Sequence, residues 1–286
     1  MKRWSTIRIN SEGNFIFNFI IGFTFYLFCS ADAIAQELDV AYVPTPDFMV
    51  ERMLDMADVG PGDYLIDLGC GDGRIVIAAA KRGAIGHGVD LDSMLITEAR
   101  KNAAKAGVAN KVVFFEQNIF ETDFSKANVI AMYLFPSINI KLRPSFLENL
   151  EPGSRIVSHD FGMDEWKPDQ QIGRMENHAA LLWIVPAKVD GNWIINIGND
   201  KYRMTVRQEF QEIDIKLMSE ETSFQVQNSL LSGKRISFTA NEKSGQQKFV
   251  FSGQVEQEKI SGIVQIREGE KSIVKNWSAK KMKLTE

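Results

Sequence analysis

The chain has 286 residues, enough for one large domain or two of ordinary size, and its hydrophobic content of 44% and charged content of 24% are typical of a globular protein. Its formal net charge of −4, without a long basic run, argues against a nucleic-acid partner. Three histidines, His87, His159 and His178, lie far apart and lack the spacing of metal ligands, so we expect structural roles for them and no bound metal.

Residues 1–35 have the pattern of an export signal. Basic residues stand at the start, an almost wholly apolar run follows at residues 15–29, and residues 33–35 fit a small-x-small cleavage site. The run is shorter than the roughly 20 residues of a membrane span, and the charges around it predict that the rest of the chain lies outside the cytoplasm. The alternatives are an uncleaved anchor, which would give the chain membrane contact, and a hydrophobic N-terminus that stays in the cytosol.

The next predicted element is a helix that begins at Thr45 and Pro46. Thr45 is a suitable N-cap with Pro46 at the first helical position, apolar residues then recur on one face, and Gly-Pro-Gly at residues 60–62 ends the helix. Packed beside the first strand, this helix would bring residues 42–45 close to the glycine loop that follows. Tyr42 and Thr45 are therefore candidate cofactor contacts.

Residues 63–81 predict a strand, a tight glycine loop and a helix. The apolar strand ends in Asp67, and glycines follow at every second position, Gly69, Gly71 and Gly73. Glycines let the backbone approach a ligand closely, and the start of the helix presents free N–H groups to it. A dinucleotide site requires G-x-G-x-x-G, whereas this loop reads G-x-G-x-G and resembles motif I of class I S-adenosylmethionine-dependent methyltransferases. The alternative is a glycine-rich turn that binds no ligand.

The second predicted strand, residues 86–90, ends in a second acid. Asp90 lies about 20 residues beyond the glycines, where an acid can accept hydrogen bonds from both ribose hydroxyls of a nucleotide. Leu91 beside it is a further candidate contact. Asp92 competes for the same role, but it is better used as the cap of the helix predicted at residues 93–106.

The third predicted strand, residues 112–116, leads to Asn118. Many methyltransferases of this class have an acid here, which accepts a hydrogen bond from the adenine amino group. The amide oxygen of Asn118 can accept the same bond without a charge. Weaker or less selective cofactor binding is therefore expected.

The fourth and fifth predicted strands, residues 129–134 and 155–158, flank a helix at residues 139–150. Strands that alternate with helices predict a parallel α/β sheet, whose ligand lies at the C-terminal ends of the strands. The candidate residues of the first four strands fall at this edge: Asp67, Asp90, Asn118 and Tyr133.

Beyond residue 186 the helical periodicity ends and short alternating runs replace it. About seven such runs, separated by turn signals, occur in residues 187–286: 193–197, 202–210, 213–217, 235–239, 248–255, 259–266 and 272–279. They predict a small all-β domain, in the form of a meander, a small sandwich or a lipocalin-like barrel. Its aromatic residues are expected in the core, and no motif there names a ligand: Phe238, Phe249, Phe251 and Trp277.

Several segments of the chain resemble one particular family of methyltransferases and not only the class as a whole. They are Y-V-P-T-P at residues 42–46, D-L-G-C-G-D-G-R-I-V at 67–76, Y-L-F-P-S-I-N-I-K-L-R-P at 133–144, R-I-V-S-H-D-F at 155–161 and W-K-P at 166–168. Over about residues 40–186 the chain resembles the seven-β-strand protein-lysine N-methyltransferases, which include the mitochondrial ATP synthase c-subunit lysine methyltransferase and its bacterial relatives. The resemblance implies a Rossmann-like, seven-stranded methyltransferase sheet, followed here by the all-β domain.

The resemblance implies S-adenosylmethionine as the cofactor and a protein lysine side chain as the methyl acceptor. Cofactor contacts are implied at Asp67, the three glycines and Asp90, and an acceptor channel is implied near Tyr133 and Pro136. Methyl transfer is an in-line displacement, so the lysine must first lose its proton, which partial desolvation favours. The Tyr133 hydroxyl could orient the amine with Asp160 as an acidic neighbour. The alternatives are an aromatic side chain that lines the sheet and an acid that belongs to a loop or caps a helix.

Two departures from the family leave another function open. Asn118 stands where an acid is usual, and the export signal would carry the chain to a compartment where the cofactor is not expected to be abundant. The alternative is an exported non-catalytic or ligand-binding protein that retains the fold, although the intact Asp67, glycines and Asp90 favour catalysis. A small-molecule or nucleic-acid methyltransferase is less favoured, because the fourth strand carries no N-P-P-Y motif.

Overall fold

The computed structural model describes residues 42–220, 222–243 and 245–282. The predicted export signal, residues 1–35, lies outside these residues. None of the helices in the described part is both long and apolar enough to cross a membrane. By its internal contacts the chain divides after Tyr42, and all the described helices and strands belong to the second unit, Val43–Glu286.

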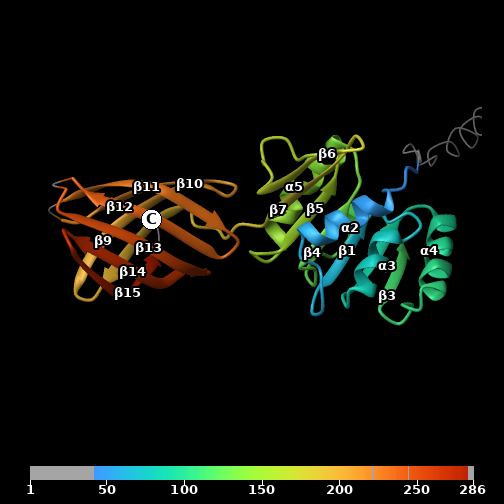
Figure 1. The fold of residues 1–286 in the computed structure, drawn as a ribbon, viewed down its shortest axis with the longest axis horizontal. Coiled ribbons are helices and arrows are strands. Elements are labelled where there is room, and N and C mark those ends of the chain that lie inside the picture. Colours follow the sequence, from blue (N-terminus) through green and yellow to red (C-terminus); the bar gives the residue numbers. More distant parts are fainter. Residues whose placement is uncertain (1–41, 221, 244, 283–286) are drawn as a thin grey trace, which may run out of the picture. The chain divides into compact units, whose positions relative to one another are not determined.

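A seven-stranded sheet forms the first half of the described chain, with the strand order β3-β2-β1-β4-β5-β7-β6 (Figure 1). The first five strands are parallel, and β7 runs antiparallel to β5 and β6. The predicted Rossmann-like α/β sheet is therefore confirmed. Its strands are β1 (Tyr64–Leu68), β2 (Ile85–Asp90), β3 (Val112–Glu116), β4 (Val129–Met132), β5 (Arg155–His159), β6 (Gln170–Met175) and β7 (His178–Ile184).

Helices cover both faces of this sheet. Leu65 of β1 packs into a buried cluster with residues of three helices, while its neighbour Ile66 packs into a second cluster with Phe146 of a fourth helix. Successive residues of a strand point to opposite faces, so each strand supplies both core layers. The helices of the first layer are α2 (Asp47–Met56), α3 (Arg74–Lys81) and α4 (Ser93–Lys105), and that of the second is α5 (Pro136–Asn149).

Two of the predicted helix starts were wrong. Pro46, not Thr45, is the N-cap of α2, because the Thr45 hydroxyl instead lies 3.1 Å from Nδ1 of His159. Helix α5 begins at Pro136 rather than Asn139, since the fixed φ of proline suits the first helical position. The predicted cap of α4 is confirmed: the Asp92 side chain accepts from the Met94 N–H at 2.8 Å.

The seven strands that the resemblance implied are present, but the sequence did not locate the last two, β6 and β7, which form a hairpin. Glu176 and Asn177 make the turn with φ of 51° and 70°, the left-handed pair that favours a two-residue hairpin connection. Strand β7 returns antiparallel to β5, with His159 opposite Ala180. The start of β7 therefore lies beside the end of β5.

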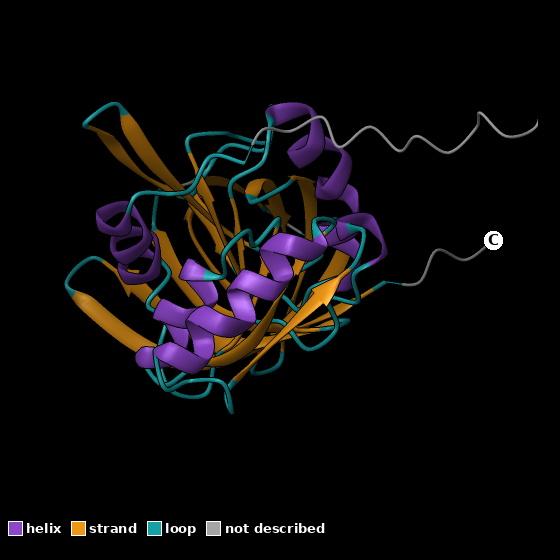
Figure 2. Cartoon of the chain, turned by 90° about the vertical axis from the view of Figure 1, so that its right-hand side faces the viewer, coloured by secondary structure: helices purple, strands orange, loops and turns teal. Residues whose placement is uncertain are grey.

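Eight antiparallel strands in the second half of the chain form a closed barrel. Each strand pairs with its neighbour in sequence, and β15 closes on β8. The described residues of the barrel include no helix (Figure 1), because the described helices, purple in Figure 2, all lie in residues 47–149. Of the predicted all-β forms, the barrel is confirmed. The strands are β8 (Gly191–Ile197), β9 (Asp200–Glu209), β10 (Glu212–Met218), β11 (Ser223–Ser232), β12 (Arg235–Glu242), β13 (Gln247–Glu256), β14 (Lys259–Glu268) and β15 (Lys271–Lys281).

Packed aromatic side chains form much of the barrel core. The rings of Phe238 and Phe251 stack at 4.4 Å, and Trp277 meets Phe251 edge-on at 5.2 Å. Phe249 is also buried. The predicted core role of these four aromatic residues is confirmed.

Strand β11 is the one barrel strand that the sequence pattern missed. Its pairing with β12 shifts register between Gln227 and Leu230, and Asn228 has a φ of 56°. Such a bulge places an extra residue in the strand and breaks the alternation of buried and exposed side chains. The signal on which a strand prediction depends is therefore absent there.

A first prediction concerns His87 on β2. Its Nδ1 lies 3.0 Å from the Tyr64 hydroxyl, and burial lowers the pKa of the imidazole. Because the folded state then binds the proton less readily than the unfolded chain, unfolding becomes easier as the pH falls below about 6.5. Between pH 7.5 and 5.5 we expect the wild type to lose more thermal stability than His87→Gln.

The melting temperature is followed through the helix signal in circular dichroism, because all the described helices lie in residues 47–149. A parallel pH dependence of the two proteins would show that His87 is not the group responsible.

Candidate active site

The turn between β1 and α3 contains three left-handed glycines. Gly69, Gly71 and Gly73 have φ of 75°, 52° and 81°, a region that only glycine enters freely. The N–H groups of Gly69 and Cys70 donate to the Val89 carbonyl at 2.9 Å, which holds the turn against the end of β2. Helix α3 follows at once, so its free N–H groups belong to the same site.

Asp90 closes this turn from the neighbouring strand. Its Oδ2 accepts from the Gly71 N–H at 2.9 Å, and its Oδ1 accepts from the Asp92 N–H at 3.0 Å. Each carboxylate oxygen has two lone pairs, so each can accept a further hydrogen bond from a ribose hydroxyl. The two backbone bonds therefore orient Asp90 for the role that its position predicts.

Asp67 lies near the end of β1 and is 1% exposed. Its Oδ2 has no hydrogen-bond partner among the residues that the structure describes. Burial raises the pKa of this carboxyl group well above its usual value, and the charges of Asp90 and Asp72 raise it further. An unpaired buried acid is unfavourable, and a ligand that carries an ammonium group would supply both a charge and a donor. The methionine part of S-adenosylmethionine has such a group, so Asp67 fits this cofactor.

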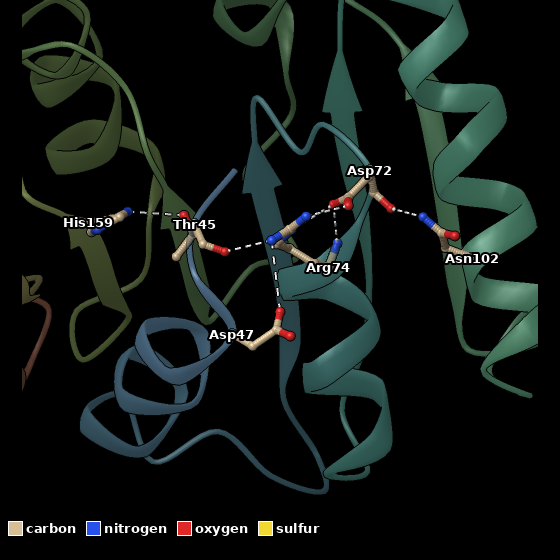
Figure 3. A network of polar contacts seen from close by, with 6 residues as sticks. All are labelled: Thr45, Asp47, Asp72, Arg74, Asn102 and His159. Atoms are coloured by element: carbon tan, nitrogen blue, oxygen red, sulfur yellow. Dashed lines mark hydrogen bonds and ion pairs between the residues drawn. The ribbon is translucent and has the colours of Figure 1, made fainter. Parts of the chain in front are cut away.

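Arg74 joins the glycine loop to the segment before α2 (Figure 3). Its guanidinium donates to both oxygens of Asp72, at 2.9 and 2.7 Å, and to the Thr45 carbonyl at 2.9 Å. Asn102 of α4 donates to the Asp72 carbonyl at 3.1 Å. Thr45 therefore lies beside the glycine loop, held there by an arginine that occupies the third glycine position of the dinucleotide pattern.

Two further residues predicted to contact the cofactor follow β2 and β3. The Leu91 side chain is 42% exposed. The Asn118 Oδ1 accepts from the Phe120 N–H at 3.1 Å and caps the short 3₁₀ helix η1 (Ile119–Glu121). One lone pair of that oxygen is left for an adenine amino group, so this contact stays a prediction.

The predicted acceptor residues lie at the ends of β4 and β5. The Tyr133 ring is centred 3.9 Å from the His159 ring and stacks on Phe161 at 5.9 Å. Phe135, the N-cap of α5, lies 5.9 Å from Phe161, and exposed Pro136 follows it. Tyr133, Phe135 and Phe161 together form an aromatic wall.

Asp160 stands directly after β5 beside this wall. Its Oδ1 accepts from the Ala179 N–H at 2.7 Å, and its backbone has a φ of 61°. Burial raises the pKa of the Tyr133 phenol, and both the Asp160 charge and a hydrogen bond between the two side chains raise it further. Asp160 is thus an acid held beside Tyr133, as the acceptor hypothesis requires, and it caps no described helix.

Two histidines that are distant in the sequence lie together at the same edge. His159 Nε2 and His178 Nδ1 are 2.9 Å apart, and Asp160 Oδ2 lies 3.4 Å from both nitrogens. Burial lowers the pKa of His159 to about 4; the charge of Asp160 opposes this shift and His178 adds to it. The expectation that the histidines are scattered was wrong for this pair, because β7 was not predicted and it pairs with β5.

One predicted cofactor contact, Tyr42, is not tested by the structure, and three residues near the site were not predicted. Tyr42 is the last residue of the N-terminal unit and is 45% exposed, so its cofactor role stays a prediction. Sequence reasoning missed Phe161 and both histidines at β5 and β7. The signal that could have located His178 is the buried strand H-A-A-L-L-W-I at residues 178–184.

Comparison with known proteins agrees with this geometry. A family model described as the ANTKMT methyltransferase domain matches residues 67–170. A protein-lysine N-methyltransferase of Saccharolobus islandicus is 41% identical over 152 residues, which are 51% of this chain and 94% of that protein. The human lysine N-methyltransferase of the ATP synthase c-subunit is 30% identical over 138 residues, which are 48% of this chain and 59% of the human protein. The chain thus matches less than two thirds of the human protein.

A solved structure described as an RNA methyltransferase from Salinibacter ruber, in complex with S-adenosyl-L-homocysteine, is 49% identical to the chain. It aligns with a TM-score of 0.50 over 51% of this chain and 96% of that one. The ligand of that relative has an ammonium group on its amino-acid part, which is the kind of donor that the unpaired Asp67 oxygen here could accept.

A second prediction tests the role of Asp67. We expect Asp67→Asn to weaken the binding of S-adenosylhomocysteine at least tenfold, because an amide loses the charged hydrogen bond to the ligand ammonium group, worth about 1.5–3 kcal/mol. Isothermal titration calorimetry on the whole chain measures this affinity. Asp92→Asn is the matched control, because asparagine also caps a helix. Equal affinities of the two variants would refute the assignment of Asp67.

Proposed function

The chain belongs to the family of S-adenosylmethionine-dependent protein-lysine N-methyltransferases, and from that membership we propose that it methylates the side-chain amine of a lysine in a protein. The Saccharolobus islandicus relative supports this membership, because 94% of its length is matched. For the acceptor, the supporting observation is the pair of Tyr133 and Asp160 beside the aromatic wall.

An acid beside aromatic rings favours a cationic acceptor. The Asp160 side chain is 22% exposed, so an incoming ammonium group can reach its carboxylate. Phe135 is 48% exposed, and its ring can cover the apolar stem of a lysine. The same carboxylate would repel a nucleic-acid phosphate, which agrees with the net charge of −4.

The proposed reaction joins a methyl donor on the cofactor side of the site to a lysine on the acceptor side. When bound, S-adenosylmethionine supplies a methyl group on a positively charged sulfur. Asp67 would hold the ammonium group of that ligand and Asp90 would hold its ribose, so the methyl group would be presented in one direction. On the acceptor side Asp160 favours capture of the lysine ammonium group. The aromatic wall desolvates it, which favours loss of its proton to water and leaves a neutral nitrogen to attack.

A nucleic-acid acceptor is the second candidate, because the Salinibacter ruber relative is described as an RNA methyltransferase. The two candidates are separated by supplying the purified chain with S-adenosylmethionine that carries a labelled methyl group. Total protein and total RNA from cells that lack the gene serve as acceptors. Label recovered as methyllysine after hydrolysis supports our proposal, whereas label confined to RNA would refute it. S-adenosylhomocysteine binding without transfer to either would favour the non-catalytic alternative.

A third prediction concerns the acceptor residues. We expect Tyr133→Phe and Asp160→Asn each to lower kcat/KM for the protein acceptor about tenfold or more, because a charge-assisted hydrogen bond of about 1.5–3 kcal/mol is lost. The affinity for S-adenosylhomocysteine should stay unchanged. Tyr64→Phe is the control, since it removes the hydroxyl that lies near His87 on another part of the sheet. Wild-type kcat/KM in both acceptor variants would exclude these residues from the reaction.

We also propose that residues 1–35 direct the chain out of the cytoplasm. The basic start, the apolar run and the small residues after it support this proposal. As a fourth prediction, the first 45 residues fused to a reporter that is active only outside the cytoplasm should give a signal. A signal from a cytosolic reporter alone would refute export and would remove the argument from cofactor supply against catalysis.

A further inference from the structure

The cluster of His159, Asp160 and His178 has the composition of a metal site. Two imidazoles and one carboxylate are ligands that first-row transition cations accept. Zinc bonds to nitrogen and oxygen are about 2.0–2.2 Å long, so two ligand atoms of a tetrahedral ion lie about 3.3 Å apart. The three distances between the converging atoms are 2.9, 3.4 and 3.4 Å. One ion could therefore contact all three atoms with only small movements.

Outer contacts orient two of these ligands. The Nδ1 of His159 lies 3.1 Å from the Thr45 hydroxyl. With the Thr45 oxygen accepting the Nδ1 proton, the Nε2 lone pair faces the cluster. The Oδ1 of Asp160 accepts from the Ala179 N–H at 2.7 Å, so its Oδ2 faces His159 and His178. Protein metal sites use such supporting contacts to fix the tautomer and the direction of their ligands.

The cluster is also accessible from one side. The His159 side chain is fully buried, while the side chains of Asp160 and His178 are 22% and 29% exposed. An ion can enter from solvent past the two exposed ligands, and a water molecule can complete its coordination. With two neutral imidazoles and one carboxylate as ligands, a bound divalent ion keeps one net positive charge. We therefore expect it to dissociate more easily than an ion bound by thiolates.

We propose that His159, Asp160 and His178 bind a divalent transition-metal cation of the zinc type, and that this cation competes with the lysine ammonium group for the Asp160 carboxylate. The binding site itself follows from the geometry of the three side chains. The competition rests on the proposed function, because it assigns Asp160 to the acceptor. A cation on Asp160 Oδ2 would neutralise the charge that attracts the acceptor, so zinc would act as an inhibitor of acceptor binding.

Zinc binding is tested without any methyl acceptor, by titrating the full chain with zinc chloride in a calorimeter. We expect one site in the wild type, and an affinity at least tenfold lower in His178→Gln. His87→Gln is the matched control, because it removes a histidine that lies outside the cluster. Wild-type affinity in His178→Gln, or no zinc binding by the wild type, would overturn the proposal.

Two measurements keep this test independent of misfolding. S-adenosylhomocysteine should bind His178→Gln as it binds the wild type when zinc is absent, which shows that the sheet is folded. Cobalt(II) added to the wild type should give the visible absorption of a low-symmetry nitrogen and oxygen site. The spectrum of hexaaqua cobalt alone would count against the site.

The competition is tested in the methyl-transfer assay with total protein as acceptor. Zinc should raise the apparent KM for the acceptor in the wild type and in His87→Gln, leave kcat unchanged, and have at least tenfold less effect on His178→Gln. Zinc that binds at the cluster without a change in KM would overturn the competition. Failure to methylate lysine with intact zinc binding would refute the proposed function and not the metal site.

Discussion

The left-handed turn between β1 and α3 is the constraint on which the sheet unit depends. Gly69 and Gly73 each have a positive φ and a side-chain neighbour within about 3 Å of where a Cβ would lie, Leu134 and Phe114 respectively. A larger residue at either position would meet both backbone strain and a packed side chain. Because the turn is this tight, the Gly71 N–H reaches Asp90 on the next strand. The backbone conformation of this turn therefore determines where Asp90 and the glycine N–H groups lie on the cofactor side of the site.

Thr45 connects this turn to the acceptor side. Its carbonyl accepts from Arg74, which is held by Asp72, and its hydroxyl lies beside His159 (Figure 3). A movement of the glycine loop that displaced Arg74 would also disturb the contact between Thr45 and His159. The segment before α2 thus links the two halves of the site through one residue, which explains why Thr45 is not used to cap its helix.

The sequence predicted the parts of the site that depend on neighbouring residues, and it missed the parts that depend on contacts between distant segments. The residues around Asp67 and Asp90 could be predicted because strand, turn and helix are adjacent in the sequence, so a local pattern determines their geometry. His159 and His178 meet only through the pairing of β5 with β7, and no local pattern fixes that pairing. Strand β11 was missed for a related reason, since its register shift removes the alternation on which the prediction depends. Asn118 could be located but its capping of η1 could not.

Charge explains why acids gather at an edge that binds a cationic cofactor. Asp72 is paired with Arg74 by two hydrogen bonds, whereas Asp67 is buried with one oxygen unpaired and Asp160 is partly open to solvent. Methyl transfer to an amine moves one positive charge from the sulfur to the acceptor nitrogen. In the proposed reaction, Asp67 would face the ammonium group of the cofactor, and Asp160 would face the acceptor nitrogen on which the new charge appears. The Asp160 carboxylate would thus stabilise the positive charge that develops on the acceptor nitrogen. The same carboxylate can also attract a metal cation.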